Sequence, residues 1–167
     1  YYRIRQGIGF NKTPEEYGAF PMDPYSHTPK HAGAQQPGMT GQVKEEVLTR
    51  FAELGLRVND GQVAFKPHLL RACEFTKEPA IFTYLDVTQQ WQSLNIPANS
   101  LAFTWCQVPI IYQLTDNQTM DITVTGAEPA SYSSDTLSPT MSKKLFTRSG
   151  EIKSITVTFN KNILFAG

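Results

Sequence analysis

The sequence has no net charge, because its 15 Lys and Arg residues balance its 15 Asp and Glu residues. A neutral chain has no overall field that attracts polyanions, so neither nucleic acid nor an anionic membrane surface is an expected partner. The sequence also has no apolar run of about 18 residues, the length that a membrane-spanning helix needs. Tyr1-Tyr2-Arg3 is an unusual beginning for a natural chain, so we expect a longer parent protein. The cellular compartment stays open.

Cysteines are scarce and the common catalytic motifs are missing. Cys73 and Cys106 are too few for a disulfide scaffold, and they lack the CxxC spacing of a zinc site. Both lie in apolar stretches, so we expect two buried free thiols, with one disulfide between them as the alternative. The sequence has no GxSxG elbow, no P-loop and no GxGxxG fingerprint, and thus no complete catalytic constellation. We predict no cofactor and no metal, and enzymatic activity of the isolated chain stays open.

The stretch Thr40–Pro67 predicts a helix, a tight turn and a strand. Thr40 is a candidate helix cap. The apolar residues after it recur at helical spacing and form one stripe: Val43, Val47, Leu48, Phe51 and Leu54. Gly55 can adopt the left-handed conformation that ends a helix. Asn59-Asp60-Gly61 is a strong turn signal, and the alternation in residues 62–66 is typical of a half-buried strand.

Beyond Pro67 the apolar pattern has the period of two that is typical of strands. The strands that it predicts are residues 81–87, 101–106, 110–114, 120–124, 145–147 and 152–159. Turn signals at residues 115–118 and at Ser149-Gly150 predict that the strands on either side form hairpins. Pro109 cannot donate to a sheet ladder, so it indicates an edge, a bulge or a break. We therefore predict a mainly β fold: an antiparallel β-sandwich of jelly-roll type, preceded by an irregular segment and one amphipathic helix.

Residues 1–39 have little periodicity and are rich in Gly, Pro, Gln and His. Polar side chains that typically line binding sites are concentrated between Asp23 and Gln36, among them His27, His31 and Gln35. His27 and His31 would share one face of a helix and could hold a metal, but Pro29 between them disfavours that helix. A polar binding loop and an ordinary surface therefore remain the alternatives for this segment.

A carboxylate pair of the glycosidase type is a further possibility. Asp23 could act with Glu15 or Glu16, provided that the two carboxyl groups lie about 5–10 Å apart across a sugar. Sequence spacing does not establish that distance, and acidic residues in loops are usually only solvated.

The order of the central motifs resembles a known family. Thr40-Gly41 opens the predicted helix, Leu54-Gly55-Leu56 ends it, and residues 60–67 form a turn and a strand that ends in proline. This order resembles the junction near the C-terminus of carbohydrate-active enzymes with a six-hairpin (α/α) barrel, notably the cellobiose-phosphorylase type. Residues 23–33, DPYSHTPKHAG, are similar to the loop in which those enzymes place residues near the substrate.

The resemblance implies a division of the chain. Residues 1–58 would be an irregular segment plus the last helix of a truncated helical barrel, and residues 59–167 would be a C-terminal β-sandwich domain. The chain would then be a non-catalytic part of a larger glycoside hydrolase or phosphorylase, with the catalytic acid upstream of Tyr1. Its implied partners are the rest of the parent enzyme and a carbohydrate.

The resemblance also implies binding residues. Residues 23–41 would complete the active-site rim, and Thr40 and Gly41 would bind phosphate or substrate, because free N–H groups at a helix N-terminus favour an anion. His27, His31 and Gln35 are further candidates in this rim. The sandwich is expected to cover the stripe formed by Val43, Val47, Phe51 and Leu54.

Two other functions stay open. Four strand aromatics are either core residues or a sugar-stacking surface of an independent carbohydrate-binding module: Tyr84, Trp91, Trp105 and Tyr112. A small stand-alone enzyme that uses Asp23, His27 and His31 is the other possibility.

Overall fold

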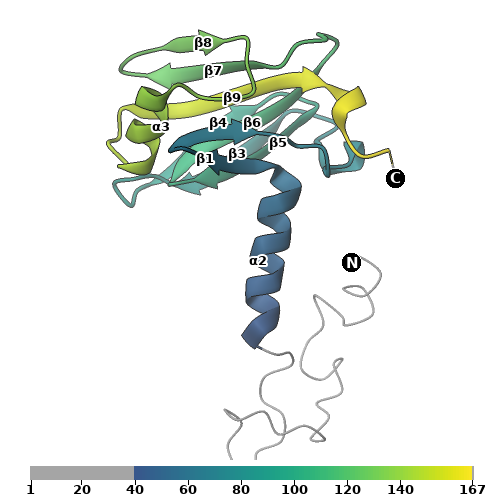
Figure 1. The fold of residues 1–167 in the computed structure, drawn as a ribbon, viewed down its shortest axis with the longest axis horizontal. Coiled ribbons are helices and arrows are strands. Elements are labelled where there is room, and N and C mark those ends of the chain that lie inside the picture. Colours follow the sequence, from purple (N-terminus) through teal and green to yellow (C-terminus); the bar gives the residue numbers. More distant parts are fainter. Residues whose placement is uncertain (1–39, 167) are drawn as a thin grey trace, which may run out of the picture. The chain divides into compact units, whose positions relative to one another are not determined.

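A computed structural model describes residues 40–166, with side chains from residue 47 onward. The elements, labelled as in Figure 1, are α2 (Thr40–Leu54), β1 (Leu56–Asn59), β2 (Gln62–Phe65), β3 (Ala80–Leu85), β4 (Trp91–Ile96), β5 (Ser100–Trp105), β6 (Val108–Thr115), β7 (Asp121–Gly126), β8 (Ala130–Tyr132), α3 (Pro139–Phe146) and β9 (Ile152–Asn160). The strands form sheets of two, two and five strands, and residues 40–166 contain no closed barrel. The predicted mainly β fold is confirmed.

The chain divides after Thr49 into two units. This boundary falls inside α2, so the last turn of the helix belongs to the β unit that begins at Arg50. The division between residues 58 and 59 that the sequence suggests remains a prediction.

The predicted helix end, turn and strand are all present. Gly55 has φ +70°, and a Cβ atom added there would lie 2.0 Å from the main-chain oxygen of Lys66, so no other residue fits without a shift. Asp60 and Gly61 have φ values of 48° and 75°, the signs that a type I′ turn requires between β1 and β2. Strand β2 is more buried than predicted, because Val63, Ala64 and Phe65 are all inaccessible.

Three contacts join the last turn of α2 to the rest of the β unit, and a fourth, between Arg50 and Glu53, lies within the helix. The Arg50 guanidinium lies 3.0 Å from the Glu53 carboxylate and 2.6 Å from the Glu74 carboxylate. The ring of Phe51 lies against Trp105, with 4.7 Å between centroids. The Tyr112 hydroxyl donates a 2.6 Å hydrogen bond to the main-chain oxygen of Leu54.

The predicted apolar stripe runs across the boundary between the two units, so only its last residues, Phe51 and Leu54, belong to the β unit. Leu54 is buried and Phe51 is half-buried, but Val47 is 61% exposed, and its neighbour Leu48 is 68% exposed. The predicted cover over Val43 and Val47 concerns the other unit and remains a prediction. The side chain of Val43 lies outside the described residues.

The five-stranded sheet has the order β5-β6-β9-β7-β8 and is mixed (Figure 1). Strand β9 pairs with β6 in parallel and with β7 in antiparallel orientation. The predicted hairpin across residues 115–118 is therefore wrong, because β9 lies between its two strands. Because β9 lies between β6 and β7, it has a hydrogen-bonding partner on both sides. The turn signal at residues 115–118 depends only on local sequence and cannot predict that a distant strand lies between its two neighbours.

Residues 145–146 belong to α3 rather than to a strand, so the hairpin predicted at Ser149-Gly150 is also wrong. Ser138 caps this helix by accepting a 3.3 Å hydrogen bond from the main-chain nitrogen of Met141, and Pro139 follows at the first helical position. A Ser followed directly by a Pro is a signal for the start of a helix. The apolar residues Met141 and Leu145 of this helix are buried in the core.

Aromatic rings make up much of the core on one face of the five-stranded sheet. Tyr112 is fully buried and meets Phe65, Phe103 and Phe159 edge-on, with centroid distances of 6.1, 5.2 and 5.4 Å. Pro109 lies one residue before the β6–β9 ladder begins at Ile110, so its missing N–H costs the sheet no hydrogen bond with β9.

The β3–β4 hairpin has two unlike faces. Phe82 and Tyr84 are half-buried and stack with 5.8 Å between centroids. On the opposite face, Ile81 is 70% exposed and Trp91 is 73% exposed, and Trp91 pairs with Leu85 across the hairpin. The face with Tyr84 borders the pocket described next.

Candidate functional site

Most of the predicted site residues lie outside the described part of the chain. This holds for His27, His31 and Gln35, and for the acids Glu15, Glu16 and Asp23. Thr40 and Gly41 form the first described turn of α2, and only their backbone is described. Their roles in anion or substrate binding therefore stay predictions.

The four aromatic residues proposed as a sugar-stacking surface do not share an exposed face. Tyr112 is fully buried in the core, and Trp105 is half-buried against Phe51. Trp91 alone among them is exposed, while Tyr84 turns to the other side of the hairpin. The prediction of one exposed surface made of all four residues is therefore wrong. Successive side chains of a strand point to opposite faces, so aromatic residues on strands do not all reach the same surface.

The cysteines are free, but they are not both buried as predicted. Cys73 is exposed in a short 3-10 turn, and Cys106 is half-buried in the β5–β6 turn. Within residues 40–166, no group of three or more His, Cys, Asp or Glu side chains gathers around a possible metal position. No helix in the same part of the chain is long and apolar enough to cross a membrane.

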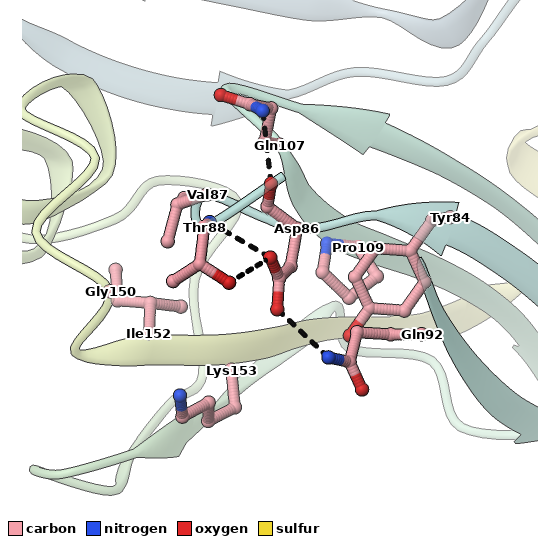
Figure 2. A pocket seen from close by; sticks show the side chains of 10 residues that line it. All are labelled: Tyr84, Asp86, Val87, Thr88, Gln92, Gln107, Pro109, Gly150, Ile152 and Lys153. Atoms are coloured by element: carbon pink, nitrogen blue, oxygen red, sulfur yellow. Dashed lines mark hydrogen bonds between the residues drawn. The ribbon is translucent and has the colours of Figure 1, made fainter. Parts of the chain in front are cut away.

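A pocket of about 410 Å³ lies between the β3–β4 hairpin, the β5–β6 turn and the start of β9 (Figure 2). Its walls combine charged, amide, hydroxyl and apolar groups, contributed by Tyr84, Asp86, Val87, Thr88, Gln92, Gln107, Pro109, Gly150, Ile152 and Lys153. Ligand pockets typically have volumes of about 300–1,000 Å³, so this one has room for a small ligand.

Asp86 organises the β3–β4 turn. Its Oδ1 atom accepts hydrogen bonds from the Thr88 main-chain nitrogen at 2.8 Å, the Thr88 hydroxyl at 2.6 Å and the Gln90 main-chain nitrogen at 3.1 Å. The bonds from Thr88 and Gln90 lower the pKa of Asp86. A carboxylate with a lowered pKa is a weak proton acceptor, so Asp86 is suited to shaping the turn rather than to acting as a general base.

Asp86 also fixes two glutamine side chains at the pocket (Figure 2). Gln92 Nε2 donates to Asp86 Oδ2 at 3.0 Å, and Gln107 Nε2 donates to the Asp86 main-chain oxygen at 3.0 Å. Both acceptors on Asp86 can only accept, so each amide must present its nitrogen to them. The two amide oxygens are thereby left as acceptors for another group.

Tyr84 and Lys153 complete the polar wall. Burial, and then the charge of Asp86, raise the pKa of the Tyr84 hydroxyl, so this group stays a neutral donor. Lys153 is exposed at the start of β9. Within residues 47–166, neither the Tyr84 hydroxyl nor the Lys153 ammonium has a hydrogen-bond or ion-pair partner.

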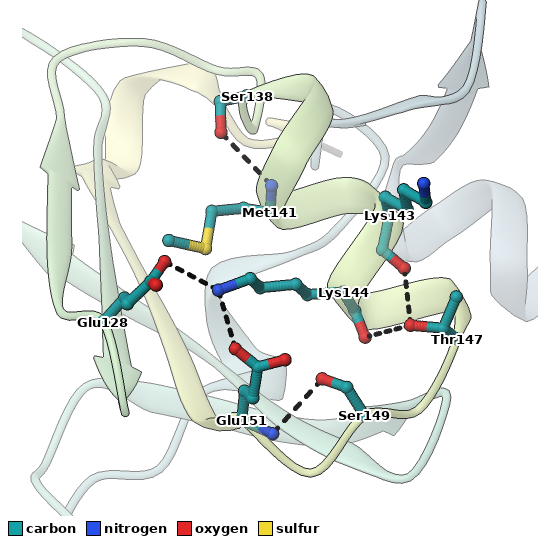
Figure 3. Close-up of polar contacts among 8 residues, drawn as sticks. All are labelled: Glu128, Ser138, Met141, Lys143, Lys144, Thr147, Ser149 and Glu151. Carbon is teal, nitrogen blue, oxygen red and sulfur yellow. Dashed lines mark hydrogen bonds and ion pairs between the residues drawn. The ribbon is translucent and has the colours of Figure 1, made fainter.

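A second polar cluster lies beside α3 (Figure 3). Lys144 Nζ lies 2.6 Å from the Glu128 carboxylate and 2.7 Å from the Glu151 carboxylate. The hydrogen bond from Lys144 lowers the pKa of Glu151, and bonds to Glu128 and Glu151 raise the pKa of Lys144. This cluster connects α3 to the β7–β8 loop and to the start of β9, which is a structural role.

Neither a protein-family model nor a curated protein matches the chain. The sequence reasoning missed the pocket, whose lining residues are distributed from Tyr84 to Lys153. The one local signal for it in the sequence is Asp86-Val87-Thr88, which lies between two stretches of strand-like pattern. An Asp side chain often accepts a hydrogen bond from the main chain two residues later, and this favours a turn.

Proposed function

We propose that this chain is a non-catalytic β domain of a larger carbohydrate-active enzyme, a glycoside hydrolase or phosphorylase. In this proposal α2 joins the domain to the catalytic part, a helical barrel. Residues 23–41 contribute to the rim of the parent's active site, with Thr40, Gly41, His27, His31 and Gln35 as the binding residues. The order of the motifs from Thr40 to Pro67 supports the proposal.

The observation that carries the proposal is the uneven burial of α2. Its last turn is held by Arg50, Phe51 and the Leu54 carbonyl, whereas Val47 and Leu48 are 61% and 68% exposed. Burying a large apolar side chain is worth about 1.5–3 kcal/mol. An apolar stripe that continues past its own domain is therefore suited to packing against a further element, such as a neighbouring barrel helix.

The same proposal includes the sandwich architecture. Ile110 and Tyr112 point to one face of β6, so Pro109 and Ile111 point to the other by alternation. Phe65 of β2 contacts Tyr112 on the first face, and Pro109 lines the pocket with Tyr84 of β3. The two hairpins would thus cover opposite faces of the five-stranded sheet.

The first test is the mass and activity of the native gene product. An antibody raised against this chain captures the product from its source cells, and intact mass spectrometry measures it. We expect a mass far above 18.7 kDa, together with hydrolysis or phosphorolysis of a glycoside by the captured protein. A native product of 18.7 kDa would overturn the proposal.

The second test addresses α2 within the parent protein. Val47→Asp should expose the junction to limited proteolysis, because a charge cannot be buried there without a partner. Val58→Asp is the matched control, since Val58 is 47% exposed on β1 rather than on α2. Equal protease sensitivity of the two variants would contradict a packed α2.

A second candidate, an independent carbohydrate-binding module, is favoured by Trp91. This ring is 73% exposed, and Leu85 and Ile81 lie on the same face of the hairpin. Exposed aromatic rings can stack on sugars. Retardation of the chain in gels that contain soluble polysaccharide, abolished by Trp91→Ala, would support this candidate, and unchanged mobility in every gel would exclude it.

A further inference from the structure

We propose that the pocket around Asp86 binds a neutral, polyhydroxylated ligand of the size of a mono- or disaccharide. The inference deepens the proposed function and rests on it for the choice of a sugar over other polyols.

The pocket has balanced charge and pre-oriented polar groups. Asp86 and Lys153 are its charged residues, one of each sign, so it favours neither an anion nor a cation. Asp86 accepts a hydrogen bond from the Gln92 amide at Oδ2 and one from the Gln107 amide at its main-chain oxygen, and it thereby holds both amides in one orientation. Groups that are held before binding lose less freedom when a ligand arrives.

The polar groups of the pocket lining include both donors and acceptors. Gln92 and Gln107 present amide oxygens, which accept from ligand hydroxyls, while Tyr84 and Lys153 present donors. The side chains of Val87, Pro109 and Ile152 supply apolar surface for the C–H groups of a sugar ring. A ligand with several neighbouring hydroxyls on an apolar ring uses both kinds of surface.

The test is a titration of the full ¹⁵N-labelled chain, followed by amide chemical shifts. The probes are glucose, galactose, mannose, cellobiose and maltose at concentrations up to about 10 mM, well above the ~1 mM Kd that corresponds to about −4 kcal/mol. Inorganic phosphate and glucuronate test charge selectivity. We expect saturable shifts from a neutral sugar at Asp86, Gln92, Gln107 and Lys153.

Two variants test the donors. Tyr84→Phe and Lys153→Met each remove a donor and should each weaken binding about two- to twelvefold, the loss that one hydrogen bond of about 0.5–1.5 kcal/mol produces. Lys143→Met is the matched control, because Lys143 is also an exposed lysine and lies on α3, outside the pocket lining. The same spectra show that each variant is folded.

Three results would overturn the pocket as a sugar site: no saturable shift with any sugar, shifts centred on Trp91, or preferential binding of phosphate or glucuronate. Each of these leaves the accessory-domain proposal intact, because that proposal depends on the mass and activity of the native product. Conversely, a native product of 18.7 kDa would end the accessory-domain proposal while saturable binding at Asp86 still supported the pocket.

Discussion

Replacing Tyr112 with phenylalanine isolates the buried hydrogen bond that holds the end of α2. Tyr112 is fully buried, and its hydroxyl donates to the Leu54 carbonyl at 2.6 Å. The substitution keeps the ring, so the edge-on contacts with Phe65, Phe103 and Phe159 remain. Loss of the donor from a buried carbonyl should lower the free energy of unfolding by about 1–3 kcal/mol.

Urea unfolding followed by circular dichroism measures this change, and the denaturant slope should stay the same because the fold is retained. Tyr132→Phe is the control, since that hydroxyl makes a longer, 3.3 Å contact with Ser138 on a half-buried ring. Amide exchange should also accelerate in the last turn of α2. A loss in Tyr112→Phe that equals the loss in Tyr132→Phe would refute the reasoning.

The same variant changes the response to alkaline pH. Burial raises the pKa of Tyr112 far above its ordinary value, because the phenolate would be buried in the core. A raised pKa in the folded state stabilises the protein fully below the unfolded pKa of about 10, and this contribution is lost as the pH rises above it. The wild type should therefore lose stability more steeply above about pH 10 than Tyr112→Phe. Parallel alkaline profiles would contradict the burial of a neutral phenol.

A pair of glycine substitutions tests backbone geometry, and one glutamate substitution tests surface charge. Gly55→Ala should destabilise the protein by about 2 kcal/mol or more, because φ is +70° and the new Cβ atom would meet the main chain of Lys66. Gly61→Ala should destabilise it by only about 1 kcal/mol, because φ is +75° but no atom lies near the new Cβ atom. Thermal unfolding compares the two, and equal losses would count against the close approach. Glu151→Gln should flatten the acid limb of the stability profile, because the hydrogen bond from Lys144 lowers the pKa of Glu151. That stabilisation is present above the unfolded pKa of about 4.3 and is lost as the pH falls through the lowered value. Urea unfolding at several acidic pH values measures it, and an unchanged limb would contradict the ion pair.

The sequence predicted the segment from Thr40 to Pro67 well because its signals are local. Gly55 ends the helix where the chain needs a positive φ, and Asp60-Gly61 has the two positive φ values of a tight hairpin turn. Each of these choices depends only on neighbouring residues, and so a reader of the sequence can make them without knowing the rest of the fold.

The arrangement of the sheet and the pocket could not be predicted in the same way. The apolar pattern of residues 152–159 shows that β9 is a strand, but it carries no information on which two strands it separates. The pocket joins Tyr84 and Asp86 to Gln107 and Lys153, and these meet only once the hairpin lies beside the sheet. The site residues predicted from the N-terminal segment remain predictions.

The position of β9 has a consequence for how the protein is made. The ribosome synthesises β6 and β7 before β9. Each of these two strands therefore has one unpaired edge until residues 152–160 leave the ribosome. During that interval each edge is a template for pairing with another nascent chain. The need for chaperones should therefore last until β9 has been synthesised, and premature termination just before Ile152 should yield an aggregating product rather than a smaller folded domain.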